Sequence, residues 1–216
     1  MVISLGQDPW ILISLTFLEL LFIIIPPLIA AKIEQTSLKE QLEFVGIQKP
    51  TKGLLRPLLK GFFGACSGIG LYFIGGYISL FYRIIIRIIL GGRFLESGSS
   101  GTISTQPIQP SIIQLIIILL LQFFIVAVSE EAFFRGFLIK KLQYKFRTIV
   151  SVFTSSIFFA LYHVPPFIVP ISTVVSFFGF YFTFGILLSV IFIGFDQSLV
   201  PVIICHGIYN FLVLLL

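Results

Sequence analysis

The stretch IIQLIIILLLQFFIVAVSEEAFFRGFL, residues 112–138, sets the fold class and raises the main functional question. Its first part, residues 112–129, carries no charge. A helix of about 20 apolar residues crosses the hydrocarbon core of a bilayer, so this run is predicted to be a membrane span. The span nevertheless continues with two adjacent glutamates, Glu130 and Glu131, followed by Arg135. Charged groups within a span are costly and usually serve a function.

The composition of the whole chain agrees with a membrane protein. Of 216 residues, 57% are hydrophobic and 11% are charged, and the mean hydropathy is +1.11. A soluble domain carries about 25% charged residues, so this chain is expected to lie mostly in a lipid bilayer. The net charge of +5 requires no nucleic-acid partner, because basic loops beside a membrane explain it. Cys66 and Cys205 fall in apolar runs, which predicts buried thiols and no disulfide framework.

Apolar runs occupy most of the remaining sequence. About six spans are predicted, within a range of six to eight: residues 10–31, 61–90, 111–139, two spans within 148–195, and 198–216. The prolines of residues 164–170 supply the turn between the two spans of 148–195. Residues 96–110, rich in Ser, Gly and Pro, are predicted to form a loop. No long polar linker divides the chain, so residues 1–216 are predicted to be one all-α, multi-pass transmembrane helical bundle in the cell membrane.

The basic residues predict an orientation. Most of them fall in two loops, after the first and the third span: Lys32, Lys39, Lys49, Lys52, Arg56 and Lys60, and then Lys140, Lys141, Lys145 and Arg147. Because basic loops tend to stay in the cytoplasm, both loops are predicted to be cytoplasmic, which leaves both chain ends outside. Arg83 and Arg87 fit this orientation if their side chains extend to the outer interface.

The two glutamates are predicted to play different parts. If the helix continues to Ile139, Glu130 lies roughly 15 Å from its cytoplasmic end, inside the hydrocarbon core. Glu131 and Arg135 are four residues apart and share a helix face, so they can pair and neutralise each other. Glu130 points about 100° away from that face and has no charged partner in its own helix. The unpaired Glu130 is therefore the candidate functional group.

Both histidines of the chain fall in predicted spans. His163 ends the run FALYH, and His206 begins HGIYN, in which Asn210 lies one turn later on the same face. We expect His163, His206, Asn210 and Glu130 to lie at overlapping depths. A carboxylate base, imidazoles and an amide donor are the groups that hydrolysis of an amide by water requires.

Each feature also has a structural explanation. A pair of glutamates at a helix end is often an interfacial feature, and a histidine within a membrane is often an interhelical hydrogen-bonding residue. His206 and Asn210 could simply join two helices. Glu19, in the first span, is interpreted as a protonated residue or one that extends to the interface, although it could also be a functional acid. The combination is more specific than any one of these residues.

The three motifs, in their order, resemble those of a known family. EEAFFR (residues 130–135) fits EExxxR, FALYH (159–163) fits FxxxH, and HGIYN (206–210) fits HxxxN. Together they are similar to the CAAX protease and bacteriocin-processing family, which includes the type II CAAX prenyl endopeptidases. The resemblance covers about residues 111–216, which would form the catalytic core, and the N-terminal half matches no motif. Well-described prenyl endopeptidases have eight spans, more than the six expected here.

The resemblance implies a role for each motif residue. Glu130 would activate the attacking water, and His163 would help to hold that water. His206 and Asn210 would stabilise the oxyanion. Glu131, Arg135 and Phe159 would support the site, and no cofactor would be required.

The resulting hypothesis is an intramembrane endopeptidase whose substrate is a membrane-associated protein or peptide, of the prenylated CAAX or the bacteriocin type, presented from the cytoplasmic side. Its nearest rival is a zinc-dependent version of the same protease, with Glu130, His163 and His206 as ligands. HExxH is absent from the sequence, and an asparagine amide is a poor zinc ligand. A proton-coupled carrier that uses Glu19, Glu130 and the histidines remains an alternative, as does an immunity factor or scaffold with little turnover.

Overall fold

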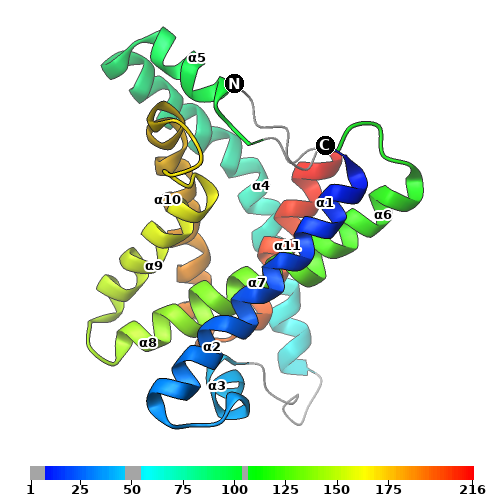
Figure 1. Ribbon diagram of the computed structural model, residues 1–216, viewed down its shortest axis with the longest axis vertical. Helices are drawn as coiled ribbons and strands as arrows, with labels where there is room; N and C mark the ends of the chain where they lie inside the picture. The colour runs from blue at the N-terminus through cyan, green and yellow to red at the C-terminus, as the bar shows by residue number, and fades with distance from the viewer. Residues whose placement is uncertain (1–7, 47–54, 104–106) are drawn as a thin grey trace.

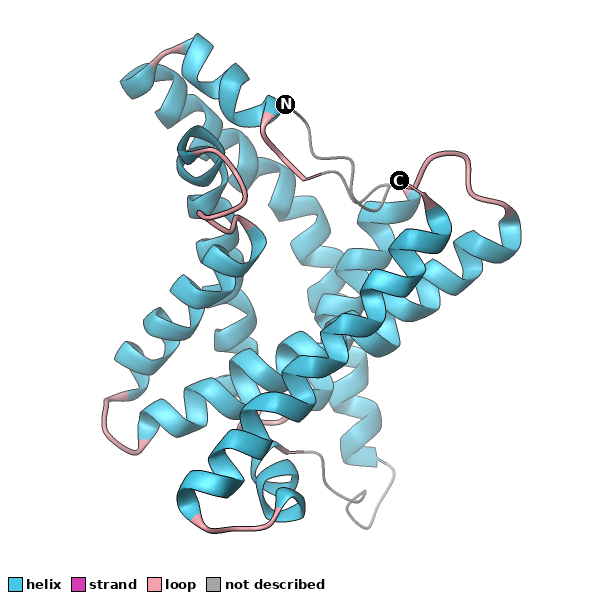
Figure 2. Ribbon diagram, viewed as in Figure 1, coloured by secondary structure: helices cyan, strands magenta, loops and turns pink. Residues whose placement is uncertain are grey.

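The computed structural model describes residues 8–46, 55–103 and 107–216, and within these ranges all regular elements are helices (Figure 1, Figure 2). In chain order they are α1 (Pro9–Thr16), η1 (Phe17–Leu20), α2 (Leu21–Glu34), α3 (Leu38–Val45), α4 (Leu55–Leu90), α5 (Gly92–Ser100), α6 (Ile112–Leu121), η2 (Gln122–Val126), α7 (Ala127–Glu131), η3 (Ala132–Ile139), α8 (Lys140–Gln143), α9 (Thr148–His163), α10 (Ile171–Gly194) and α11 (Leu199–Leu215). Here η1 is a 3₁₀ helix, whereas η2 and η3 are π-helical segments.

Several helices are long and apolar enough to cross a membrane, so the all-α, multi-pass class is confirmed. Among the described residues there are four such continuous helices: Pro9–Glu34, Leu55–Leu90, Ile112–Gln143 and Ile171–Gly194. The two remaining predicted spans correspond to α9 and α11, which are apolar but have only 16 and 17 residues. The predicted count of six therefore includes two helices that are shorter than a full span. The protein is an integral membrane protein.

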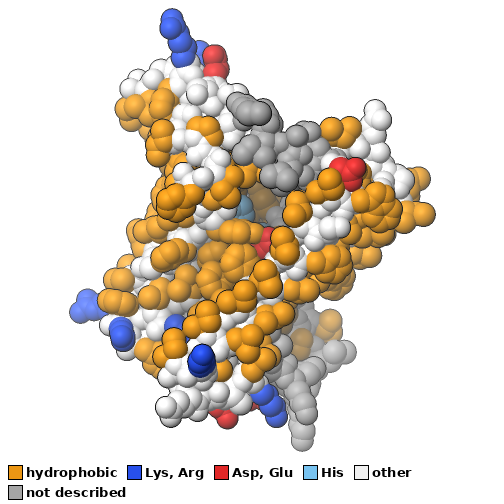
Figure 3. Space-filling model, in the orientation of Figure 1, with side chains coloured by type: hydrophobic (Ala, Val, Ile, Leu, Met, Phe, Trp, Pro, Cys, Tyr) orange, Lys and Arg blue, Asp and Glu red, His pale blue; other side chains and the backbone are white. Residues whose placement is uncertain are grey.

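The surface shows how such a chain sits in a bilayer. On the face in Figure 3, hydrophobic side chains cover the middle of the molecule, and most charged side chains lie toward its two ends. α3 and α8 lie together at one end, and α5 lies at the other (Figure 1). Lys141 of α8 forms an ion pair of 2.5 Å with Glu34 at the end of α2, so the two basic loops face the same side, as predicted. Which side of the membrane they face remains a prediction.

The first part of the predicted loop at residues 96–110 is helical instead. Residues 96–100 belong to α5, which packs against α10. The hydroxyl of Thr173 donates a hydrogen bond of 2.8 Å to the carbonyl of Gly98, and Ser97 lies 3.3 Å from Ser172, oxygen to oxygen. Tertiary contacts therefore override the weak helix propensity of glycine and serine. Residues 104–106 of the predicted loop lie outside the described residues, and residues 164–170 form the turn between α9 and α10, as predicted.

Close packing of α4 on α11 fixes the helix that carries His206. Gly64 and Gly68 form a GxxxG pattern, which lets two membrane helices approach closely. A Cβ at Gly64 would lie 2.5 Å from the carbonyl oxygen of Pro201, and one at Gly68 would lie 2.6 Å from that of Cys205. Cys205 is buried as predicted, but Cys66 is exposed, because it lies on another face of α4.

The short helix α3 docks onto the C-terminal half of the chain through Lys140. The ammonium of Lys140 donates to the carbonyl oxygens of Phe44 and Val45, at 2.9 and 3.3 Å. These carbonyls end α3, where a cation is favoured by the helix dipole. At Gly136, a Cβ would lie 2.5 Å from the Val45 carbonyl oxygen, so glycine is required for this approach.

Candidate active site

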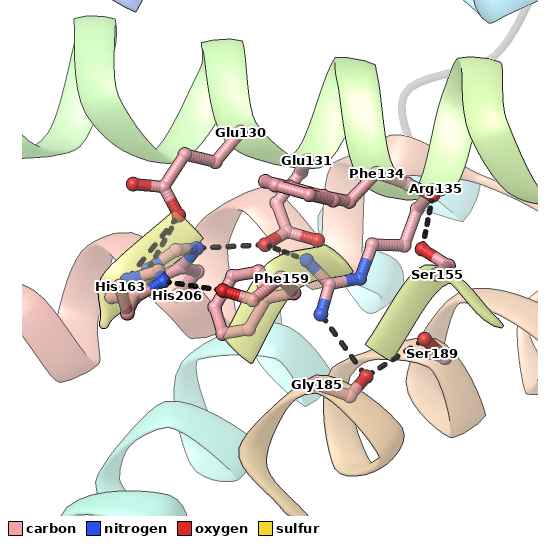
Figure 4. Close-up of polar contacts among 10 residues, drawn as sticks. All are labelled: Glu130, Glu131, Phe134, Arg135, Ser155, Phe159, His163, Gly185, Ser189 and His206. Carbon is pink, nitrogen blue, oxygen red and sulfur yellow. Dashed lines mark hydrogen bonds and ion pairs between the residues drawn. The ribbon is translucent and has the colours of Figure 1, made fainter. Parts of the chain in front are cut away.

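Three helices bring Glu130, His163 and His206 together (Figure 4). Glu130 lies on α7 with only 3% of its surface exposed, His163 ends α9, and His206 lies in the middle of α11. The Glu130 Oε2 atom is 3.8 Å from Nε2 of His163 and 4.0 Å from Nε2 of His206. Oε2 has no hydrogen-bond partner among the described residues. Two imidazole nitrogens and a buried carboxylate oxygen thus face one small region.

The helix that carries the two glutamates is not a regular α-helix. α7 has only five residues and lies between the π-helical segments η2 and η3. Such segments break the regular backbone hydrogen bonds and are frequent at functional sites. Ser155 of α9 compensates for part of this irregularity, because its hydroxyl donates a bond of 2.8 Å to the carbonyl of Phe134 in η3. This contact also ties α9, and with it His163, to the glutamate helix.

Glu131 and Arg135 pair as predicted, and both side chains are fully buried. Arg135 Nη1 lies 2.9 Å from Glu131 Oε1, and Nη2 donates to the carbonyl of Gly185 at 3.0 Å. The guanidinium carbon also lies 4.6 Å from the ring centre of Phe159. The same Glu131 oxygen lies 2.7 Å from Nδ1 of His206, a contact that the sequence did not predict. Glu131 therefore fixes the orientation of His206 as well as compensating the charge of Arg135.

A hydrogen bond to the backbone fixes the tautomer of His163 and leaves a lone pair on the nitrogen that faces Glu130. Nδ1 lies 2.9 Å from the backbone carbonyl oxygen of Phe159. A carbonyl can only accept, so Nδ1 carries the proton, and in the neutral ring Nε2 is an acceptor. The ring is held between Phe159 and Tyr181, whose ring centres lie 4.3 and 4.5 Å away. Phe159 thus supports His163 with both its backbone and its side chain.

A cavity of about 240 Å³ adjoins these groups. Its wall includes His163, His206, Asn210, Gln122 and Tyr181. The Asn210 amide nitrogen lies 3.4 Å from Gln122 Oε1, so Asn210 is directed toward η2 while it also lines the cavity. In Figure 3, a histidine and an acidic side chain are visible in a hollow of the face shown. Sequence reasoning did not identify Gln122 or Tyr181, because neither belongs to a motif.

The zinc alternative requires three donor atoms about 2 Å from one point. In the ranges that the structure describes, no three His, Cys, Asp or Glu side chains are arranged to hold a metal ion. The donor atoms of Glu130, His163 and His206 face one another, but they do not form such a ligand set. The zinc-dependent mechanism stays an alternative, which the metal content of the active protein tests.

Comparison with family models matches residues 112–212 to the type II CAAX prenyl endopeptidase Rce1-like family. This segment contains Glu130, His163, His206 and Asn210, and it lies within the region that carries the three motifs. No curated protein and no solved structure matches the chain. Residues 112–212, slightly less than half of the chain, are therefore similar to the type II CAAX prenyl endopeptidase Rce1-like family, the resemblance that the three motifs predicted.

Proposed function

We propose that this protein is an intramembrane endopeptidase in which Glu130 activates a water molecule to hydrolyse a peptide bond. The observation that carries the proposal is the buried, unpartnered Oε2 of Glu130, within 4.0 Å of two imidazole nitrogens beside a cavity. An unsatisfied buried carboxylate oxygen is costly unless a ligand or water completes its hydrogen bonding. A hydrolase gains from such an oxygen because it can accept a proton from water.

The proposal gives each group a part that its hydrogen-bond direction supports. A water between Glu130 Oε2 and His163 Nε2, 3.8 Å apart, would donate one proton to each acceptor, which directs its lone pair toward the substrate. When the water attacks the carbonyl carbon, Glu130 takes its proton and the carbonyl oxygen becomes negative. As the C–N bond breaks, that proton passes from Glu130 to the leaving nitrogen. No metal is required at any of these steps.

His206 and Asn210 supply the donors for the oxyanion in this mechanism. Nε2 of His206 can donate only if the ring carries a proton on both nitrogens, since Nδ1 already faces Glu131 at 2.7 Å. The negative charge of Glu131 compensates the additional positive charge on His206. The positive charge of Arg135, which pairs with Glu131, compensates the second carboxylate, that of Glu130. With Glu130 ionised, the charges of Glu130, Glu131, Arg135 and His206 then sum to zero, which suits groups buried in an apolar environment.

The substrate is a membrane-associated protein or peptide, and a prenylated CAAX peptide is the first choice of probe. The apolar surroundings of the cavity, which include Phe180, Phe184, Val213 and Leu214, suit a hydrophobic ligand next to the polar groups. A bacteriocin-type precursor is the other substrate class. We expect the active site to work without a cofactor and in the cell membrane.

The test uses purified protein in liposomes with a farnesylated CAAX peptide. Glu130→Gln keeps the size of the side chain but removes the base, so turnover is expected to fall by about 10²- to 10⁴-fold with the protein still folded. Binding of uncut substrate by this variant, followed by mass spectrometry of what co-purifies from membranes, identifies the natural substrate. Wild-type turnover in Glu130→Gln would contradict the proposal, and proton-driven flux without cleavage would favour a carrier.

A further inference from the structure

A second carboxylate, from the N-terminal half of the chain, lies beside the proposed catalytic groups. Glu19 is in η1, the 3₁₀ segment between α1 and α2, and its Oε1 accepts a hydrogen bond from the hydroxyl of Tyr162. Tyr162 directly precedes His163 on α9. Its ring packs edge-on against Phe22, with the ring centres 5.0 Å apart, so the hydroxyl has a fixed direction. The expectation that Glu19 extends to the interface is therefore replaced by a contact with the helix of the site.

Glu19 also lies close to the segment that carries Glu130, because η1 packs against both η2 and α7. Glu19 thus acts on the same region as the family motifs, although residues 112–212 do not include it.

The hydrogen bond between Tyr162 and Glu19 joins α9 to η1, and we call it the clamp. A purely structural role as a clamp would account for the burial of only one of the two carboxylate oxygens of Glu19. Oε1 meets the Tyr162 hydroxyl, but Oε2 is buried without a hydrogen-bond partner among the described residues. An unsatisfied buried carboxylate oxygen is destabilising, so its presence beside a catalytic centre indicates a donor that arrives with a ligand. On a peptide substrate, the donor next to the attacked carbonyl is the N–H of the scissile amide.

We propose that Oε2 of Glu19 accepts a hydrogen bond from the N–H of the scissile amide and holds the leaving amine after cleavage. Tyr162 is a positioning residue that directs Glu19. The inference rests on the proposed function, because it assumes attack by a water that Glu130 activates. The water proton moves to Glu130, the C–N bond breaks, and the same proton moves from Glu130 to the nitrogen. Glu19 gains and loses no proton; it selects substrates that carry an N–H at that position.

The experiment compares two probes that differ in one atom group. The first is a liposome-bound farnesylated cysteine peptide with two aliphatic residues and a terminal serine; the second has an ester in place of the amide after the cysteine. The ester has no N–H for Glu19 to accept. The measured quantity is the ratio of kcat/KM for the amide to kcat/KM for the ester, in which effects on folding and on Glu130 cancel.

In Glu19→Gln, the side-chain carbonyl can still accept from Tyr162, so the clamp is kept, while the second position becomes an NH₂ donor. We expect the amide-to-ester ratio to fall by about 10- to 100-fold, the rate factor that corresponds to the free energy of one hydrogen bond to a charged group. Tyr162→Phe is expected to lower the ratio by a smaller factor than Glu19→Gln does. Glu19 is still present in this variant, but it has lost the hydrogen bond that orients it. Glu34→Gln, at the exposed end of the same helical segment, is the matched control, and its ratio is expected to equal that of the wild type.

The outcomes separate the inference from the proposed function. Equal loss on both probes in Glu19→Gln would leave the clamp as the role of Glu19 and overturn the inference. Wild-type rates on both probes in Glu19→Gln would overturn it as well, and in both cases an inactive Glu130→Gln would leave the proposed function standing. A Glu130→Gln variant that cleaves the amide at the wild-type rate would overturn both.

Discussion

Glu131→Gln is expected to destabilise the protein much more than Glu130→Gln, although both changes remove one buried charge. Glu131 and Arg135 are fully buried, and their ion pair measures 2.9 Å. Removing one partner of a buried pair leaves the other charge uncompensated, which costs about 3–5 kcal/mol. Arg135 keeps the Gly185 carbonyl and the face of Phe159, so the lower value, about 3 kcal/mol, is expected.

This cost converts into a measurable shift of the unfolding midpoint. For a chain of this length, each kcal/mol corresponds to about 2–4 °C, so Glu131→Gln should lower the midpoint by about 6–12 °C. Among the described residues, the nearest ion-pair partner of Glu130 lies 3.8 Å away, so Glu130→Gln should change the midpoint by less than about 2 °C. Both variants should lose turnover, because Glu131 also orients His206.

The assay is thermal unfolding in detergent, followed with a thiol-reactive fluorogenic dye. A Cys66→Ser background removes the exposed thiol, so that the dye reports the exposure of Cys205, which is fully buried next to His206. The double variant Glu131→Gln with Arg135→Met removes both charges and should recover most of the lost stability. Equal midpoints for the two single glutamate variants, or a double variant no more stable than Glu131→Gln, would refute the reasoning.

Four further predictions concern topology, catalysis, metal and packing. A reporter fused at Lys145 should read cytoplasmic and one at Ser99 external, and a cytoplasmic signal from Ser99 would contradict the orientation. Asn210→Ala should lower kcat by about 10²- to 10³-fold with little change in KM, whereas a rise in KM alone would remove Asn210 from the oxyanion site. Active, detergent-purified protein should hold far less than one metal ion per chain; one zinc per chain that rises and falls with activity would support the metalloprotease instead. Gly68→Ala should destabilise the protein because its Cβ would meet α11, whereas Gly70→Ala, whose Cβ would have no neighbour within 4 Å in the described part of the chain, should not, and equal effects would argue against this packing.

The sequence predicted the features that depend on one helix at a time. A long apolar run in a bilayer forms a helix, because a helix satisfies its own backbone hydrogen bonds without water. The all-α class follows from this. The Glu131–Arg135 pair was predictable for the same reason, since residues four apart share a face of an α-helix. The motifs that identify Glu130, His163 and His206 are also patterns within single helices.

Contacts between helices depended on the tertiary structure, because spacing in the sequence does not show how helices cross. Nothing in the spacing predicted that Glu131 also holds His206, or that Tyr162 donates to Glu19 from the other half of the chain. The π-helical segments on both sides of α7 shift the angular phase along that helix, so a regular 100° step cannot give the direction in which Glu130 points. The sequence alone determined which residues are candidates for the chemistry and on which helices they lie. The crossing of α7, α9 and α11, together with those local changes of helical phase, decided which of their atoms meet.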